Sequence, residues 1–309
     1  MALSNITIDP ARTAIAIGYK QPGLIADQVL PRVPVEGMIY KYEKYSLEQS
    51  FDVVNDVVGA RGKVQQATLS SESVTGQVKD YALDFPLTQE ELAAKAPTPA
   101  MDRRTRAMKS NLARILRNRE KRVADLVFNE NTYPASNKTT LTGTGQWSHA
   151  DSTPLTAIRT AAEGMVVWPN TLVVSGEVLF KLQRNKEIVA AVYNAQTSNG
   201  FVPIEALKEL FQVENILVGR GFYNAAAKGK TFSKQAYWGK HAALLYLSDQ
   251  LNGDDATFGF TAQFGTRYAG EINDPDVGMR GGVRFRVGES LDEHITCPAL
   301  GYFFKNAIA

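Results

Sequence analysis

The chain has 309 residues, with 44% hydrophobic and 21% charged residues and a formal net charge of +2. This composition excludes a disordered chain and leaves room for about two folded domains. No stretch approaches the ~20 apolar residues of a membrane span, and the N-terminus lacks the basic and apolar blocks of a secretory signal peptide.

Residues 1–35 contain four prolines and two glycines among small apolar residues. Prolines at this density interrupt helices and strands, so we expect no periodic element longer than one turn. The segment is predicted to be an extended arm that becomes ordered only by lying on another surface.

Two alternating stretches follow, residues 38–54 and 74–87, separated by the polar, glycine-containing residues 55–73. Strict alternation predicts strands, and the polar stretch predicts the tip of a long hairpin. A two-stranded ribbon alone is marginally stable in water. We therefore expect the ribbon to pack on a neighbouring subunit, although a β-rich domain with a poor core is an alternative.

Residues 98–130 predict one long basic amphipathic helix. Apolar residues such as Met108, Leu112 and Ile115 recur at helical spacing, and the segment holds nine Lys and Arg against four Asp and Glu. Such a charged face is either merely solvated or faces a polyanion such as packaged nucleic acid. Five basic residues share the side away from the apolar row: Arg103, Arg106, Arg114, Arg117 and Lys121.

The remaining residues mix helical and strand patterns, which predicts an α+β protein. Helices are expected at 155–165, at 178–189 as one element, and at 204–211. Strands are expected at 171–175, 214–218, 242–247, 257–264, 282–287 and 300–305. The last strands have no helices of their own, so they are expected to form a sheet beside the long helix.

This order of elements resembles the major capsid proteins of tailed bacteriophages, which have the HK97-like fold. Three stretches are similar to segments of that family: Trp147-x3-Asp151-x2-Pro154, the stretch from Pro169 to Ser175, and the stretch from Phe211 to Gly219. The resemblance implies an N-arm at 1–35, an E-loop β-hairpin at 36–86, a P-domain at 87–160 and 265–309 with a spine helix at 98–130, and an α/β A-domain at 161–264.

The resemblance also implies the function: a non-enzymatic shell subunit that forms hexamers and pentamers of an icosahedral capsid around double-stranded DNA. Its expected partners are copies of itself, the DNA, a maturation protease, a portal protein, and decoration or minor capsid proteins. Scaffolding is expected from a separate protein, because the chain begins with Met1 and then the arm. The expected location is the virion, after assembly in host cytoplasm, without cofactor, metal or membrane. The alternatives are an encapsulin-like compartment and a nucleic-acid-binding scaffold protein.

Enzymatic readings find little support in the sequence. Three histidines, His149, His241 and His294, lack metal-ligand spacing, and the single cysteine, Cys297, excludes an internal disulfide and predicts simple packing in a strand. The Gly219-Arg-Gly221 stretch is a dinucleotide fingerprint without its third glycine.

Some family members link an E-loop lysine to an asparagine of another subunit. Lys63 and Lys79 lie in the predicted E-loop. No carboxylate and asparagine partner is identifiable, so a non-covalent shell is expected.

Overall fold

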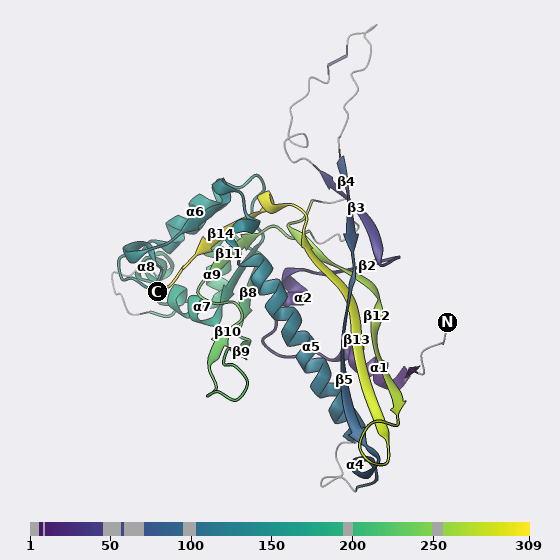
Figure 1. The fold of residues 1–309 in the computed structure, drawn as a ribbon. Coiled ribbons are helices and arrows are strands. Elements are labelled where there is room, and N and C mark those ends of the chain that lie inside the picture. Colours follow the sequence, from purple (N-terminus) through teal and green to yellow (C-terminus); the bar gives the residue numbers. More distant parts are fainter. Residues whose placement is uncertain are drawn as a thin grey trace.

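The computed structural model describes residues 6–8, 10–45, 57–58, 71–94, 103–193, 200–248 and 256–309. These residues form two units, an elongated, mainly antiparallel sheet and an α/β unit, which are joined along one long helix, α5 (Arg103–Val127) (Figure 1). The predicted α+β class is confirmed. The predicted helix at 98–130 is confirmed over α5, and residues 98–102 lie outside the described residues.

The elongated sheet has the strand order β1-β12-β13-β5, with β2 paired parallel to β12. Helix α5 lies along this sheet, where Met108 and Leu112 of the helix share a core with Ala269 and Val287 of the strands. The predicted sheet beside the long helix is therefore confirmed for the strands expected at 257–264 and 282–287, but it is wrong for 300–305, which join the other sheet. The strands are β1 (Ile6–Ile8), β2 (Arg32–Val35), β5 (Lys79–Thr88), β12 (Gly259–Asp274) and β13 (Gly282–Ile295), and α4 (Gln89–Ala93) follows β5.

The α/β unit is built on a second sheet with the order β6-β14-β11-β7-β8. All five residues of β7, which lies between β11 and β8, are buried, as the unbroken apolar run predicts. Helices form at the positions predicted at 155–165 and 204–211. The elements are β6 (Lys138–Thr140), α6 (Pro154–Glu163), β7 (Thr171–Ser175), α7 (Gly176–Gln183), α8 (Lys186–Tyr193), α9 (Ile204–Phe211), β8 (Asn215–Gly219), β11 (Ala242–Leu245) and β14 (Gly301–Lys305).

Smaller elements complete the chain. The strands β9 (Phe222–Asn224) and β10 (Lys234–Ala236) form a separate two-stranded hairpin after β8. Short 3₁₀ turns lie at Glu130–Thr132, Ala135–Asn137, Gly143–Gly145 and Pro298–Leu300.

The predicted single helix at 178–189 is wrong, because α7 and α8 are separate helices. The break falls at Asn185, whose side-chain oxygen accepts a hydrogen bond from the Glu187 backbone (3.0 Å) while its amide nitrogen donates to Ser152 Oγ (3.0 Å). Asparagine favours such local bonds over a helix interior, so a new helix begins after it.

The prediction of no helix in residues 1–35 is also wrong. This segment contains α1 (Pro10–Gly18) and α2 (Ala26–Val29). Pro10 is the first residue of α1, a position where the missing N–H costs nothing. Ala16 is fully buried in the core around Met108, so this part of the chain packs on its own subunit.

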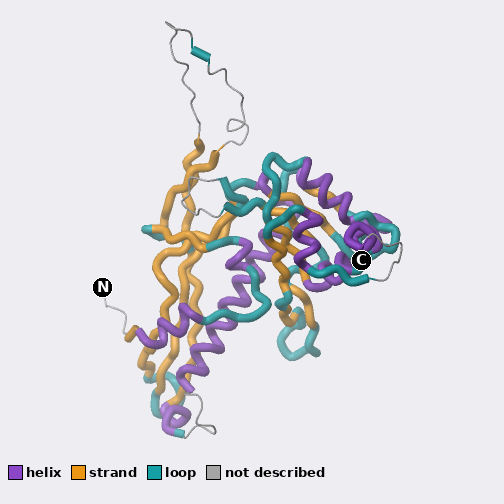
Figure 2. Tube along the Cα trace, turned by 180° about the vertical axis from the view of Figure 1, so that it is seen from behind, coloured by secondary structure: helices purple, strands orange, loops and turns teal. Residues whose placement is uncertain are grey.

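The predicted hairpin of residues 36–86 is confirmed only at its base. There β3 (Ile39–Tyr45) pairs with β4 (Ser71–Gln77), and this ribbon lies at the end of the molecule opposite α4 (Figure 2). Most of the predicted tip lies outside the described residues. The predicted second strand divides at the buried Val78 into β4, which pairs with β3, and β5, which pairs with β13 over ten residues.

The predicted domain boundaries differ from the two sheets. Residue 264 lies inside β12, at an irregularity after which pairing with β13 resumes at Tyr268, so a boundary there would divide one strand. Strand β14, assigned with residues 265–309 to the P-domain, instead lies between β6 and β11 in the α/β sheet. The last strand returns to the α/β unit because Phe303 and Phe304 are buried in its two cores.

Candidate functional site

The exposed side of α5 is the candidate site, and its opposite side fixes its orientation. Leu112, Ile115 and Val123 are buried against the two units, so the helix cannot rotate about its axis without exposing them. Its 25 residues form a rod of about 38 Å. The basic stripe, defined as Arg103, Arg106, Arg114, Arg117 and Lys121, runs along the side away from this core.

The five residues of the basic stripe differ in their contacts. Arg106 and Arg114 are exposed and Arg103 is half-buried, and none of the three forms an ion pair or hydrogen bond with the described residues. Arg117 is exposed, with its guanidinium within hydrogen-bond distance of the Gln21 side-chain amide (2.9 and 3.0 Å). Lys121 forms an ion pair with Asp125. The stripe therefore offers open positive charge mainly over its first four members.

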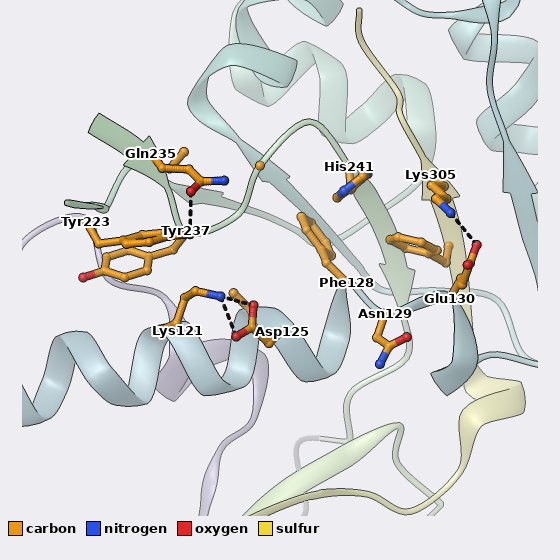
Figure 3. A pocket seen from close by; sticks show the side chains of 14 residues that line it. Lys121, Asp125, Phe128, Asn129, Glu130, Tyr223, Gln235, Tyr237, His241 and Lys305 are labelled. Carbon is orange, nitrogen blue, oxygen red and sulfur yellow. Dashed lines mark hydrogen bonds and ion pairs between the residues drawn. The ribbon is translucent and has the colours of Figure 1, made fainter. Parts of the chain in front are cut away.

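Lys121 opens onto a hollow of about 360 Å³ at the C-terminal end of α5 (Figure 3). Its two lysines are already paired, Lys121 with Asp125 and Lys305 with Glu130 (2.7 Å). Burial lowers the pKa of His241, which also lines the hollow. The lining thus has little net charge and is unsuited to binding an anion.

Helix α5 also carries arginines outside the stripe, whose contacts the sequence analysis did not predict. Arg119 lies four residues from both Ile115 and Val123, so helical spacing alone places it on the apolar face. It is almost fully buried, forms an ion pair with Asp27, and donates to Thr261 Oγ1 (3.0 Å).

Arg122 likewise points into the structure. Its Nη2 donates to Glu293 (2.6 Å) and its guanidinium lies 3.7 Å from the centre of the Tyr81 ring. Both arginines therefore hold α5 to the elongated sheet and are not available to an external polyanion.

Glu120 is a further side chain whose role sequence reasoning missed. Its carboxylate accepts hydrogen bonds from the backbone N–H groups of Ile25 (2.9 Å) and Ala26 (2.8 Å) and from Trp238 Nε1 (2.5 Å). Burial raises the pKa of Glu120, against the opposing effect of these donors. Glu120 thereby ties the start of α2, the long helix and the α/β unit together.

The residues considered for enzyme chemistry have structural surroundings. Gly219-Arg-Gly221 leads into strand β9 and not into a helix, so it lacks the helix N-terminus that a dinucleotide site needs. A side chain at Gly219 would overlap the Trp238 ring, with a Cβ contact of 2.0 Å, which explains the glycine.

The histidine and cysteine residues also have surroundings that indicate a structural role. His294 stacks on Tyr42 with ring centroids 4.6 Å apart and lies 3.1 Å from the Tyr40 hydroxyl through Nδ1. Cys297 lies beyond the end of β13 at Ile295, half-buried beside the core of the α/β unit, so the predicted place within a strand is wrong. His149 is exposed beside Asp151. Among the described residues no group of three His, Cys, Asp or Glu side chains could hold a metal ion, and no helix is long and apolar enough to cross a membrane.

Comparison with known proteins identifies close relatives. The chain is 42% identical to the major capsid protein of Pseudomonas phage JBD67 over 312 residues, covering 100% of both chains. It is 28% identical to the major capsid protein of Burkholderia phage BcepMu over 257 residues, covering 81% of this chain and 80% of the other. No protein-family profile matches the sequence.

Solved structures show the same fold. A phage-related protein from Bordetella bronchiseptica RB50 superposes with a TM-score of 0.75 at 22% identity, covering 98% of both chains. The capsid of a native GTA particle gives a TM-score of 0.58 at 12% identity, covering 94% of this chain and 92% of the other. The relatives are named as capsid proteins, which are structural proteins and not enzymes, and such proteins assemble into the shell of a virion. The chain therefore belongs to the major capsid proteins of tailed bacteriophages, the family with the HK97-like fold.

Proposed function

We propose that this chain forms hexamers and pentamers of an icosahedral shell that encloses double-stranded DNA, with the basic stripe of α5 on the inner wall. The observation that carries the proposal is the stripe itself. Arg106 and Arg114 are exposed and have no partner among the described residues, on a helix whose opposite side is fixed in the core. Like charges spaced three and four residues apart repel each other, and nearby phosphates would relieve that repulsion.

The domain assignment follows the two sheets. In this proposal the P-domain consists of α5 with the elongated sheet of β5, β12 and β13, and the A-domain is the α/β unit including β14. The E-loop consists of the β3-β4 ribbon and the residues between its strands. The N-arm is residues 1–35, of which β1, α1, α2 and β2 all pack on the same subunit.

The further partners are those of a capsid that is filled with DNA. They are a separate scaffolding protein, a maturation protease, a portal protein, and decoration or minor capsid proteins, with assembly in the host cytoplasm. Lys63 lies outside the described residues, and Lys79 is exposed at the start of β5. A non-covalent shell remains our proposal. A compartment for a cargo enzyme would not need the basic stripe, so the stripe favours DNA over an encapsulin-like function.

Electron microscopy of the purified recombinant chain, alone and with its scaffolding protein, tests this function. We expect uniform polyhedral shells whose reconstruction places Arg106 and Arg114 on the inner wall. Monomers under every condition would contradict shell assembly. Shells with these arginines on the outer wall would contradict only the DNA-facing assignment.

A further inference from the structure

The β9-β10 hairpin projects from the α/β unit, away from the α5 axis, in both overall views (Figures 1 and 2). Its tip has a fixed shape. Asn224 Oδ1 accepts hydrogen bonds from the Ala226 N–H (3.1 Å) and the Ser233 N–H (2.9 Å), and the Ala225 N–H donates to the Ser233 carbonyl (2.8 Å). A loop held in this way loses little conformational entropy when a partner binds.

One face of the hairpin is anchored to the rest of the molecule. Tyr223 donates from its hydroxyl to Gln235 Oε1 (2.7 Å), stacks on Tyr237 with ring centroids 5.3 Å apart, and lies over Lys121 of α5 at 5.4 Å (Figure 3). Because side chains alternate along a strand, the residues beside Tyr223 point to the other face.

That other face is apolar, basic and open. Phe222 is 49% exposed and Phe232 is 60% exposed, with their ring centroids 6.5 Å apart, and Lys234 lies 4.7 Å from the centre of the Phe222 ring. Large exposed aromatic residues beside each other on a rigid element mark an interaction surface. We call this surface the basic-aromatic finger and define it as Phe222, Lys228, Lys230, Phe232 and Lys234.

The charge of the finger restricts its partner. All three lysines are exposed, and residues 215–248 contain no Asp or Glu. Duplex DNA would satisfy the lysines, but its phosphate backbone offers nothing apolar to cover the two phenylalanines. A protein surface that combines carboxylates with exposed apolar side chains fits both features.

This chain has such a surface at the other end of β8. Val166 is 51% exposed and Trp168 is 40% exposed, and Glu209 and Glu214 are exposed beside them. Trp168 Nε1 donates to the Gln212 carbonyl (3.0 Å), which places the indole next to the end of α9. We call Val166, Trp168, Glu209 and Glu214 the acidic-aromatic patch.

The nearby cations leave the two carboxylates of the patch available. Lys208 forms an ion pair with Glu205 (3.1 Å), and Arg159 donates to the Leu210 carbonyl (3.0 and 3.2 Å). Glu214 of the patch directly precedes β8, and the finger follows β8 in the chain. The five residues of β8 span about 17 Å, which separates the two surfaces along the strand. The two surfaces therefore lie at opposite ends of one edge strand of the same subunit.

We propose that the basic-aromatic finger of one subunit docks on the acidic-aromatic patch of the next copy of this chain. This inference rests on the proposed shell, in which each subunit meets other copies. Two different surfaces of one chain that bind each other form a head-to-tail interface, and such an interface closes into a ring when the rotation between subunits allows it. The finger would thus supply a contact within hexamers and pentamers.

Charge reversal and its rescue test the interface. The triple variant K228E/K230E/K234E should lower the fraction of chain in shells or capsomers at least about tenfold, because like charges would then face each other. Its melting temperature should stay that of the wild type, since all three side chains are exposed. Adding E209K/E214K to the same chain should restore assembly to about half of the wild-type level or more.

A matched pair of acidic residues outside the patch controls for total charge. Adding E90K/E177K to the triple variant exchanges the same number of exposed charges and should restore nothing. The variant Phe232→Ser should lower assembly without changing the melting temperature.

Four outcomes would overturn the inference. Normal assembly of the triple variant, while the wild type forms shells, would remove the interface and leave the capsid function intact. Rescue by E90K/E177K would reduce the effect to net charge. Normal shells that release DNA more readily would assign the lysines to DNA. Absence of wild-type shells would instead contradict the proposed function on which the interface depends.

Discussion

Glu289 is a carboxylate in the interior of the elongated sheet, with 2% of its surface exposed. Its Oε2 accepts hydrogen bonds from Arg32 Nη1 (3.0 Å) and from Arg267 Nε (3.1 Å) and Nη2 (3.0 Å). A buried charge is tolerated only when it is paired and hydrogen-bonded. Arg32 belongs to β2, so this carboxylate adds a side-chain tie between the N-terminal segment and the sheet, beside the backbone pairing of β2 with β12.

Replacing Glu289 with Gln should therefore destabilise the protein strongly. The substitution keeps the side chain's shape but removes the charge that Arg267 and Arg32 share, which we expect to cost about 3–5 kcal/mol of unfolding free energy. Chemical denaturation followed by circular dichroism measures the loss. Glu90→Gln is the control, because Glu90 is exposed and its ion pair with Arg280 is long, at 4.0 Å. An exposed ion pair contributes little, so this variant should change the free energy of unfolding by less than about 0.5 kcal/mol. Equal stability of the two variants would contradict the role given to Glu289.

Asp84 makes a different contribution, one that depends on pH. Both of its oxygens accept hydrogen bonds from Arg286, from Nε and from Nη2, each at 2.7 Å. The bond to Arg286 lowers the pKa of Asp84 below its ordinary value of 3.8. A carboxyl whose pKa is lower in the folded state stabilises the fold above its unfolded pKa, and the contribution disappears as pH falls through the folded pKa.

Asp84→Asn should therefore cost about 1 kcal/mol of unfolding free energy at neutral pH, a value discounted for the partial exposure of the pair. As pH falls below 3.8, the wild type should lose this advantage and approach the variant. Chemical denaturation of both proteins over a pH series gives the difference directly. A difference that stays constant into the acid range would show that Asp84 contributes through packing and not through its charge.

At the scale of single elements, α5 has one side that builds the core and one that does not. Leu112 is fully buried between α1 and the elongated sheet, whereas Arg114, two residues later, is exposed. Leu112→Ala should cost about 2–5 kcal/mol of unfolding free energy, because it leaves a cavity among Ala16, Met108 and Val287.

Arg114→Ala is the matched control for Leu112→Ala. It lies on the same helix, has no contact with the core and should change stability by less than about 0.5 kcal/mol. Thermal unfolding of the two variants beside the wild type measures both effects. Similar losses would mean that Arg114 is held by the fold and is not free to meet a polyanion.

Elements whose residues carry their own signal could be predicted from the sequence. The buried run of β7 and the periodic residues of α9 gave bounds close to those observed, because burial on one or both sides fixes their pattern. The division of 74–87 at Val78 could not be predicted, since it depends on pairing with β13, some two hundred residues later. Helix α1 was missed because Pro10 starts a helix as readily as it stops one.

The candidate site was predicted in part. The spacing placed Arg106, Arg114 and Arg117 on the exposed side, and the structure agrees. Arg119 could have been recognised as buried from its distance to Ile115 and Val123. The role of Glu120 could not, because its donors on α2 and Trp238 come together only in the fold. The basic-aromatic finger is visible in sequence only as an acid-free stretch.

At the scale of the whole molecule, α5 connects both units and keeps its basic stripe on the side away from their cores. The first part of its apolar side packs with the elongated sheet, and Val123 and Val127 pack with the α/β unit around Trp238 and Phe303. A helix fixed by two cores holds its basic stripe at a constant orientation in every copy of the chain. If the stripe lies on the inner wall, as we propose, that repetition would line the wall of the shell with positive charge.

The variant R106Q/R114Q tests this surface in assembled particles. Glutamine keeps the helix propensity close to that of arginine, so α5 should dock as before and shells of normal diameter should form. Packaged DNA repels itself, and removing two cations per subunit weakens the screening that opposes release. We expect filled variant particles to release DNA faster than the wild type at low salt, on the order of a few-fold. The difference should shrink as salt is added, because salt screens phosphate charge within about 8–10 Å.

The control K181Q/K186Q removes two exposed lysines of α7 and α8 and should retain DNA like the wild type. Equal retention by R106Q/R114Q at every ionic strength would leave the stripe as a surface that does not meet the genome.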